Sequence, residues 1–322
     1  MHWLFFVQSP DAKYPRPMLT YIAPVFLIMA LGAVIRRLPQ APAVTLFPAL
    51  EWFSFYVAFP ALLFLRTASL DLDATVVQSL ALLVLTPMAA VLAIVLTGLR
   101  LVGSLPGPSR SSVVQGSVRP STYFGLAVAG LALPDQAATL VMLALALAMP
   151  AVNIVAVVAL SWWSGRQVTF LGMVRGIVRN PIILATVVGA LYNLSDWPLG
   201  AIVTKALEIL AQVALGLGLV CVGGGLELRL QGAMPRAMVC TNAIKLLLLP
   251  GLTWVVCRVL QADHTMTLAA CFYASLPTAP NAYIMARQLG GDARLMASLI
   301  TSQTLIAILS VPLWLAWLGV GS

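Results

Sequence analysis

Long apolar stretches recur along this 322-residue chain, and short polar segments rich in Pro, Gly and Arg separate them. The stretches are continuous rather than alternating, which is typical of membrane-spanning helices and not of transmembrane β-barrels. Each has close to the roughly 20 residues that an α-helix needs to cross a bilayer core. The pattern therefore predicts an all-α protein with ten transmembrane helices, at residues 18–36, 44–66, 74–101, 112–133, 137–162, 179–194, 200–226, 237–259, 265–288 and 295–318.

The second half of this pattern repeats the first half after 157 to 160 residues. Gly32 and Gly189 lie 157 residues apart, and RPSTY at 119–123 precedes APNAY at 279–283 by 160 residues. Each repeat contains five spans, an odd number, so the two copies have opposite orientations in the membrane; such inverted repeats are typical of transporters that hold substrate between the copies. We divide the chain into an N-terminal segment, a first repeat, a linker and a second repeat, at residues 1–17, 18–162, 163–178 and 179–322.

The composition excludes a soluble protein. Hydrophobic residues make up 61% of the chain and charged residues 9%, against about 45–50% and about 25% in soluble domains. The N-terminal MHWLFFV lacks a basic flank, so we expect no cleaved signal peptide. The four cysteines lie within predicted spans without a C-x-x-C pair, so we interpret them as packing residues and expect no metal and no cofactor. The net charge of +8 comes from scattered arginines, which does not indicate nucleic-acid binding.

Basic residues gather on one side of the predicted topology. The side that holds the odd-numbered connections collects Arg36, Arg37, Arg100, Arg110, Arg166, Arg175, Arg179, Arg229, Arg236, Arg287 and Arg294. The side that holds both termini has Lys13, Arg16, Arg66, Lys205 and Arg258. Because basic loops favour the cytoplasm, the asymmetry predicts a multi-pass protein of the plasma (bacterial inner) membrane with both termini outside the cytoplasm.

Spans four and nine carry proline and polar residues well inside the predicted membrane region. The fourth has RPS at 119–121, and the ninth has Pro277, Pro280 and Asn281. Proline removes a backbone donor and clashes with the preceding turn, so both helices are predicted to be interrupted. Backbone groups freed at that depth need protein or a wet cavity beside them, and a half-helix start there favours an anion such as a carboxylate. The alternative is a proline kink packed by neighbours, but matching breaks in both repeats favour a binding site.

Arg119 gives this site its candidate charge. A guanidinium group can hold a carboxylate through two parallel hydrogen bonds. The alternatives are an internal ion pair with Glu51 or Glu208, or a side chain that extends toward the cytoplasm. Asn153, in the fifth span, is interpreted instead as a hydrogen bond between helices.

At these residues the chain resembles the auxin efflux carrier family of secondary transporters. The strings that carry the resemblance are GAVIRR, FYVAFPALLFL, RPSTYFGLA, AMPAVNIV, IVRNPI and LPTAPNAYIMARQLGGD. The resemblance implies a fold similar to those of bile acid symporters and sodium/proton antiporters, in which spans 4 and 9 cross at their breaks. It implies an elevator mechanism, with spans 1, 2, 6 and 7 as a scaffold that is often dimeric and the other spans as a moving domain. It also implies small organic anions such as malate, malonate or auxin as substrates.

Carried onto this chain, the resemblance identifies Pro120 and Pro280 as the crossover prolines and Ser121 and Asn281 as the carboxylate-binding positions. Related sequences place Asn where this chain has Ser121, so that half of the site loses two amide donors. With their motif neighbours, the predicted substrate-binding residues are Arg119, Pro120, Ser121, Thr122, Pro280, Asn281 and Tyr283.

Three further charged residues fall within predicted spans and are candidates for coupling to protons. Glu51 and Glu208 are related by the repeat, and Lys245 lies in span eight. The simpler interpretation pairs Glu208 with Lys205 one turn earlier and leaves Glu51 near the cytoplasmic interface. Lys245 is compatible with a proton site, a substrate counter-charge or the partner of an acid. The coupling ion is not identified.

Other functional classes are less compatible with the sequence. Both histidines, His2 and His264, lie outside the spans, which excludes an H-E-x-x-H metalloprotease. Leu289 occupies the first glycine position of a G-x-G-D protease motif, so GGD at 290–292 predicts a turn. We therefore expect no enzyme. The remaining alternative is a membrane-embedded carboxylate sensor that binds without transport.

Overall fold

The computed structural model describes residues 19–39, 42–69, 74–102, 105–164, 179, 181–195, 199–226 and 234–319. Helices are the regular elements throughout these ranges, and six helical stretches are long and apolar enough to cross a membrane. Two shorter apolar helices, at Phe26–Ile35 and Pro181–Asn193, accompany them. The predicted N-terminal segment and most of the predicted linker lie outside the described residues. The protein is an all-helical, multi-pass membrane protein.

Each of the ten ranges predicted from the sequence coincides with one helix or with a consecutive set. The single helices are α1 (Leu19–Ile35), α4 (Ala74–Val102), α7 (Asp135–Ser164), α9 (Pro181–Asn193), α10 (Ala201–Gly224) and α15 (Ala293–Trp317). Spans two and eight are α2 (Ala43–Phe53), η1 (Ser54–Ala58) and α3 (Phe59–Ala68), and α11 (Pro235–Ala243), η2 (Ile244–Leu248) and α12 (Leu249–Val259). Spans four and nine are the broken pairs α5 (Gly107–Val118) with α6 (Thr122–Ala132), and α13 (His264–Ser275) with α14 (Asn281–Leu289).

Proline explains the π-helical turns η1 and η2. Each turn ends two residues before a proline, Pro60 or Pro250. A proline inside a helix cannot donate to the carbonyl four residues earlier and clashes with it, and a widened turn relieves that clash. For Pro250 the orphaned carbonyl is that of Leu246, and the indole Nε1 of Trp314 donates to it at 3.0 Å. The helices of spans two and eight therefore continue past their prolines, whereas those of spans four and nine are interrupted.

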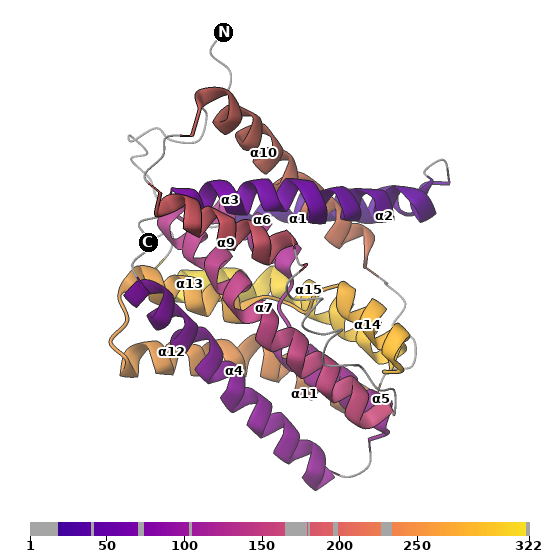
Figure 1. Ribbon diagram of the computed structural model, residues 1–322. Helices are drawn as coiled ribbons and strands as arrows, with labels where there is room; N and C mark the ends of the chain where they lie inside the picture. The colour runs from indigo at the N-terminus through magenta and orange to yellow at the C-terminus, as the bar shows by residue number, and fades with distance from the viewer. Residues whose placement is uncertain are drawn as a thin grey trace.

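The helices form two groups (Figure 1). In the first group, α1 packs on α10 and α9 packs on α3, with α2 and η1 alongside. In the second group, α7 packs on α5 and α13, while α12, α4 and α15 complete the bundle. The helix α6 lies at the boundary, because it contacts α1 and α10 on one side and α7 on the other. The boundary between the groups is the place where a cavity can form.

Glycine permits the closest approach within the first group. A Cβ atom at Gly32 of α1 would overlap the backbone of Val220, and one at Gly223 of α10 would overlap the backbone of Met29. The two helices thus touch backbone to backbone, which is the usual role of small residues between membrane helices.

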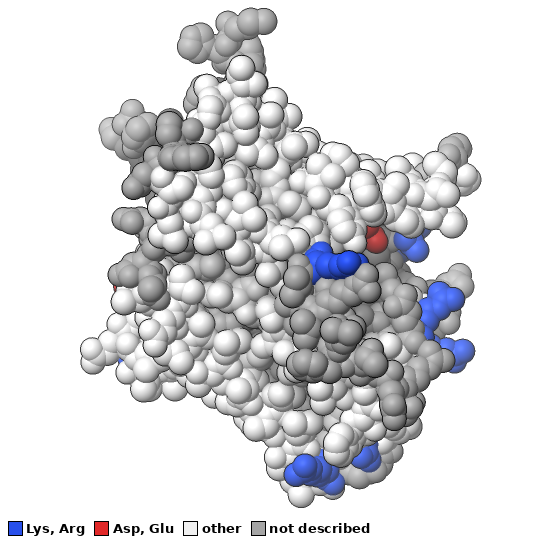
Figure 2. Space-filling model, in the orientation of Figure 1, with Lys and Arg blue, Asp and Glu red and all other residues white. Residues whose placement is uncertain are grey.

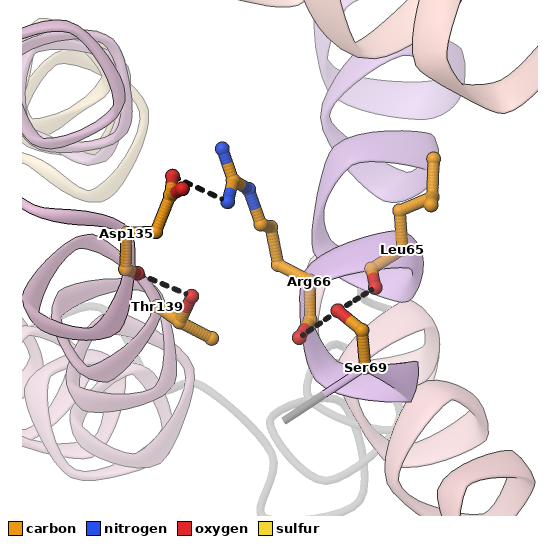
Figure 3. Close-up of polar contacts among 5 residues, drawn as sticks. All are labelled: Leu65, Arg66, Ser69, Asp135 and Thr139. Atoms are coloured by element: carbon orange, nitrogen blue, oxygen red, sulfur yellow. Dashed lines mark hydrogen bonds and ion pairs between the residues drawn. The ribbon is translucent and has the colours of Figure 1, made fainter. Parts of the chain in front are cut away.

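An ion pair joins the two groups at the ends of α3 and α7. Arg66 donates to Asp135 at 2.8 Å, and Figure 3 shows the two side chains reaching toward each other across the boundary. Each residue is held locally as well: Thr139 donates to the Asp135 carbonyl at 2.8 Å, and Ser69 donates to that of Arg66 at 3.3 Å. The pair is a polar contact between elements that otherwise meet through apolar packing.

The turn after span nine has the structure that its sequence predicts. Gly290 ends α14 with a φ of 81°, a left-handed conformation that favours glycine. Asp292 then caps α15 by accepting from the Leu295 amide at 3.0 Å, and it also accepts from Ser109 at 2.8 Å. The GGD sequence at 290–292 is therefore a helix–helix turn tied to the start of α5.

Candidate functional site

The breaks in spans four and nine lie against each other. Arg119 and Ser121 are extended between α5 and α6, and Leu276 is extended at the end of α13. The amide of Ser121 donates to the Pro277 carbonyl at 2.7 Å, which joins segments more than 150 residues apart. The predicted interruptions are confirmed, and they meet in one place.

A buried glutamine closes this junction. The Gln303 side chain accepts from the Thr278 amide at 2.9 Å and donates to the Gly116 carbonyl at 2.9 Å. The Thr278 hydroxyl donates to the same carbonyl at 3.1 Å. Broken helices leave backbone groups that a membrane interior cannot satisfy with water, and here a side chain from α15 satisfies them. The junction is thereby held in a defined geometry.

A cavity of about 80 Å³ lies beside the junction, between the two helix groups. Phe55 of η1 reaches it from the first group. Apolar walls dominate, with four polar side chains at one boundary. The lining residues are Phe55, Arg119, Pro120, Thr122, Tyr123, Leu145, Met149, Val152, Asn153, Ala279, Pro280 and Asn281. Such an apolar pocket with a few convergent polar groups is the usual form of a small-molecule site.

Arg119 is the charged group of this cavity. Its side chain is only 7% exposed, and its Nε donates to Asn281 Oδ1 at 3.2 Å. Its NH1 nitrogen is buried and has no hydrogen-bond partner, and no ion pair of Arg119 occurs within the described ranges. The ion pairs with Glu51 or Glu208 considered from sequence are therefore not what holds this guanidinium. A buried cation with an unused donor suits an anion in the adjoining cavity.

Two helix starts meet beside Arg119. The helix α6 begins at Thr122 and α14 begins at Asn281, and both residues line the cavity. Neither start has a side-chain cap. Helix starts carry partial positive charge, which favours a carboxylate in the same place as the guanidinium.

The predicted site residues divide between two cavities. Pro120 and Pro280 line the first cavity together with Arg119, Thr122 and Asn281. Tyr283 instead lines a second cavity of about 230 Å³. Its lining also includes Arg36, Glu51, Tyr123, Pro280 and Asn281, so the last three residues separate the two cavities. The second cavity is thus a space adjoining the first, on the side of Arg36.

Ser121 has a different position from the one its motif suggests. Its side chain is buried, its hydroxyl has no partner, and it lines neither cavity. Its backbone amide, rather than its hydroxyl, makes the contact across the junction. Ser in place of Asn at this position therefore affects the segment that holds the junction together more directly than it affects the residues that line the cavity.

The coupling candidates also separate. Glu208 accepts from Lys205 at 2.9 Å on the exposed surface of α10, so the simpler interpretation of that pair holds. Glu51 lines the second cavity with Arg36. Lys245 is fully buried in the second helix group and lines neither cavity. Lys245 therefore does not contact a ligand held in either space.

The sequence interpretation missed the contribution of span five. Leu145, Met149, Val152 and Asn153 of α7 line the cavity, and Asn153 was assigned to packing between helices. A polar residue within AMPAVNIV was the available signal. The sequence does not show which face of α7 meets the junction, and that face decides the outcome.

Metal ligands do not gather near this site. In the parts of the chain that the structure describes, no group of three or more His, Cys, Asp or Glu side chains is placed to hold a metal ion. Arg119 is the positively charged side chain among the residues that line this cavity.

Comparison with known proteins indicates a membrane transport protein. Residues 166–315 match the family described as Membrane transport protein. Over 299 residues, the chain is 26% identical to a protein of Rhizobium meliloti (strain 1021) named "Putative malonate transporter". That alignment covers 90% of this chain and 92% of the Rhizobium protein. The second half of the chain therefore matches the membrane transport protein family, and nearly the whole chain is similar to a protein named as a transporter.

Proposed function

We propose that this protein is a secondary transporter that moves a small dicarboxylate of the malonate or malate type across the cytoplasmic membrane by alternating access. The observation that carries the proposal is the buried guanidinium of Arg119, whose NH1 has no partner beside the cavity. Asn281 and the starts of α6 and α14 supply the further donors that a carboxylate needs. The name of the Rhizobium relative supports malonate as the first substrate to test.

The proposal includes ten spans in two inverted repeats, residues 18–162 and 179–322. Packing of the repeat-related glycines supports it. Gly32 places α1 against α10, and Gly189 places α9 against Thr67 and the backbone of Phe64 on α3. Span one thus meets span seven as span six meets span two, which is the relation expected of two copies of one unit.

We assign the first helix group to a scaffold and the second to a moving domain, as in an elevator mechanism. The cavity supports this assignment, because α7 and the breaks of spans four and nine provide its lining apart from Phe55, which comes from the first group. A substrate held there would travel with that group while Phe55 stays behind. The scaffold would also provide the surface of a homodimer, since large apolar side chains such as Leu27, Leu191 and Ile202 are exposed on α1, α9 and α10.

We place both termini outside the cytoplasm. Figure 2 shows Lys and Arg side chains at the lower edge, at the right-hand edge and near the middle of the face in view, while most of the described surface of that face is uncharged. Arg36, Arg100 and Arg110, at the ends of α1, α4 and α5, are among the residues of this side. Cytoplasmic loops favour such residues, so this side, with the second cavity, would face the cytoplasm.

The test is exchange of labelled malonate and malate in proteoliposomes. The unmodified protein is expected to exchange one or both acids. Arg119→Ala should weaken binding by about 10- to 150-fold, because a hydrogen bond to a charged group is worth about 1.5–3 kcal/mol. The matched control is Arg258→Ala, which removes an arginine that stacks on Trp254 at 6.0 Å, remote from the cavity lining.

Each result has a separate meaning. Exchange that persists unchanged in Arg119→Ala would contradict the anion site at this cavity. Binding of malonate without exchange would favour the alternative, a carboxylate sensor on a transporter fold. Equal losses in Arg119→Ala and Arg258→Ala would indicate damage to the fold rather than to the site.

A further inference from the structure

Lys245 is a fully buried lysine that the proposed anion site does not use. It lies in η2 with 0% exposure, and its Nζ has no hydrogen-bond partner. An amine at that depth is costly unless it is paired or neutral. A lysine at this position is therefore expected to have a function or an ionic partner.

Contacts on either side locate Lys245 within the second helix group. Asn242 donates to Ser302 at 2.9 Å, and Trp314 donates to the Leu246 carbonyl at 3.0 Å. These two contacts bracket Lys245, so it lies opposite the intervening part of α15, which contains Ser310. The serine hydroxyl is also buried without a partner.

The opposite boundary of this region is α5. The methyl group of Thr241, one turn before Lys245, lies 3.1 Å from the position that a Cβ atom on Gly116 would occupy. The neighbouring Gln115 is fully buried, and both atoms of its amide lack partners. The Arg119 amide donates to the Gln115 carbonyl at 2.9 Å, so Gln115 lies one helical turn before Arg119 on the same segment.

No carboxylate among the described residues balances Lys245. The turn η2 packs against α5, α13 and α15, and it continues α11 and α12. None of these helices contains Asp or Glu, and the caps Asp263 and Asp292 lie at the outer ends of α13 and α15. The titratable and charged side chains that these helices carry are Arg110, Arg236, Cys240, Lys245, Cys257, Arg258, His264, Cys271, Tyr273, Arg287 of the following α14, and Arg294. Of these, Tyr273 is buried with an unpartnered hydroxyl, and Cys271 is buried beside Cys257.

Two of the three interpretations from sequence can therefore be set aside. A structural ion pair needs an acid, and the described helices around Lys245 provide none. Direct contact with the substrate needs a place on a cavity wall, and Lys245 lines neither cavity. A site that gains and loses a proton needs the amine, and each of the three helices that pack on η2 carries a buried polar group without a partner: Gln115 on α5, Tyr273 on α13 and Ser310 on α15.

We propose that Lys245 binds the proton that crosses the membrane with each dicarboxylate, so that the protein is an anion/proton symporter. This inference rests on the proposed transport function. A dicarboxylate carries two negative charges, and Arg119 offsets one of them. A protonated Lys245, in the same moving group, offsets the other. The loaded group is then neutral, which lowers the cost of moving it through the bilayer, and the bound anion in turn favours the protonated amine.

The test compares two kinds of transport in one preparation. Exchange of malonate at equal pH needs no net proton movement, whereas accumulation driven by a pH gradient does. With the membrane potential clamped near zero, the unmodified protein is expected to accumulate malonate about tenfold for each pH unit when the vesicle interior is alkaline. Lys245→Arg should keep exchange and lose this accumulation, because the guanidinium keeps its charge and does not release the proton. Lys245→Met should also lose accumulation, because its side chain binds no proton.

Controls separate the possible failures. Lys205→Met removes an exposed lysine and should leave both kinds of transport intact. If Lys245→Met does not fold, as judged by size-exclusion profile, Lys245→Arg retains the charge and tests the same point. Calorimetric titration of malonate in buffers of different ionisation enthalpy should show uptake of a proton by the unmodified protein and none by Lys245→Arg.

The outcomes are distinguishable. Accumulation that survives in Lys245→Arg, or exchange by the unmodified protein that ignores the pH gradient, would overturn the role of Lys245 and leave the anion carrier standing. Failure of the unmodified protein to bind or exchange malonate and malate would overturn the proposed dicarboxylate function and this inference with it.

Discussion

At the scale of single residues, Arg119 and Asn281 both line the cavity and form a hydrogen bond with each other. The guanidinium is buried where a charge is costly, and the amide oxygen of Asn281 accepts from its Nε at 3.2 Å. That contact orients the guanidinium and leaves NH1 available. The amide nitrogen of Asn281 is then free in orientation to donate toward the same cavity, so Asn281 acts both on Arg119 and on the ligand.

We expect Asn281→Ala to weaken malonate binding by about 3- to 10-fold, since a neutral hydrogen bond contributes about 0.5–1.5 kcal/mol. Ser121→Ala should have a smaller effect, because Ser121 lines neither cavity. Calorimetric titration of both variants checks the difference. A larger loss in Ser121→Ala would show that the bound state draws its hydroxyl into the site.

Span five illustrates the limit of residue-level prediction. Arg119, Thr122 and Asn281 were predicted from motifs and do line the cavity, whereas Asn153 was predicted to pack between helices and lines it as well. A polar residue in a membrane helix suits either role. The choice depends on the rotation of α7 about its axis, which the residue type does not encode.

Proline acts differently in different elements. Pro87 and Pro150 lie within continuous helices, and Pro60 and Pro250 follow π-helical turns. At the breaks in spans four and nine, Gln303 and the opposing segment provide partners for the freed backbone groups. The sequence predicts the breaks through paired repeat positions, but the satisfying groups lie on α15 and come together only in the fold.

Close packing of α1 on α10 leads to a prediction about stability. Gly223→Ala should destabilise the protein by about 1–3 kcal/mol, because the new methyl group would overlap the backbone of Met29, which cannot rotate away. Thermal unfolding in detergent measures the change. Gly216→Ala, in the same helix, is the matched control, since no atom lies within 4 Å of its added Cβ. Equal midpoints for the two variants would contradict the close approach.

At the scale of the whole molecule, the helices form two groups. The ion pair between Arg66 and Asp135 joins these groups, so it should respond when one group moves relative to the other. Arg66 belongs to α3 of the first group and Asp135 to α7 of the second, 2.8 Å apart in Figure 3. The Asp135 side chain is 78% exposed, so the pair contributes at most about 1 kcal/mol. Sliding of one group past the other would separate these residues.

We therefore expect Asp135→Asn and Arg66→Gln each to change the malonate exchange rate by less than about fivefold, with the double variant no different from either single one. High salt should remove the difference from the unmodified protein, because it screens an exposed pair. Initial exchange rates of the unmodified protein, the two single variants and the double variant form a double-mutant cycle. Additive effects of the two substitutions would show that the pair does not act as a unit.

The sequence by itself determined that the chain is a helical membrane protein, where its helices lie, and where two of them break. Those features depend on local composition, on helix length against bilayer thickness, and on proline chemistry, all of which act within a few turns of chain. The tertiary structure decided which faces meet: that Asn153 and Phe55 line the cavity, that Ser121 does not, and that Lys245 is buried without an acid beside it. These depend on contacts between segments far apart in the chain, and the rotation and depth of each helix in the bundle set them.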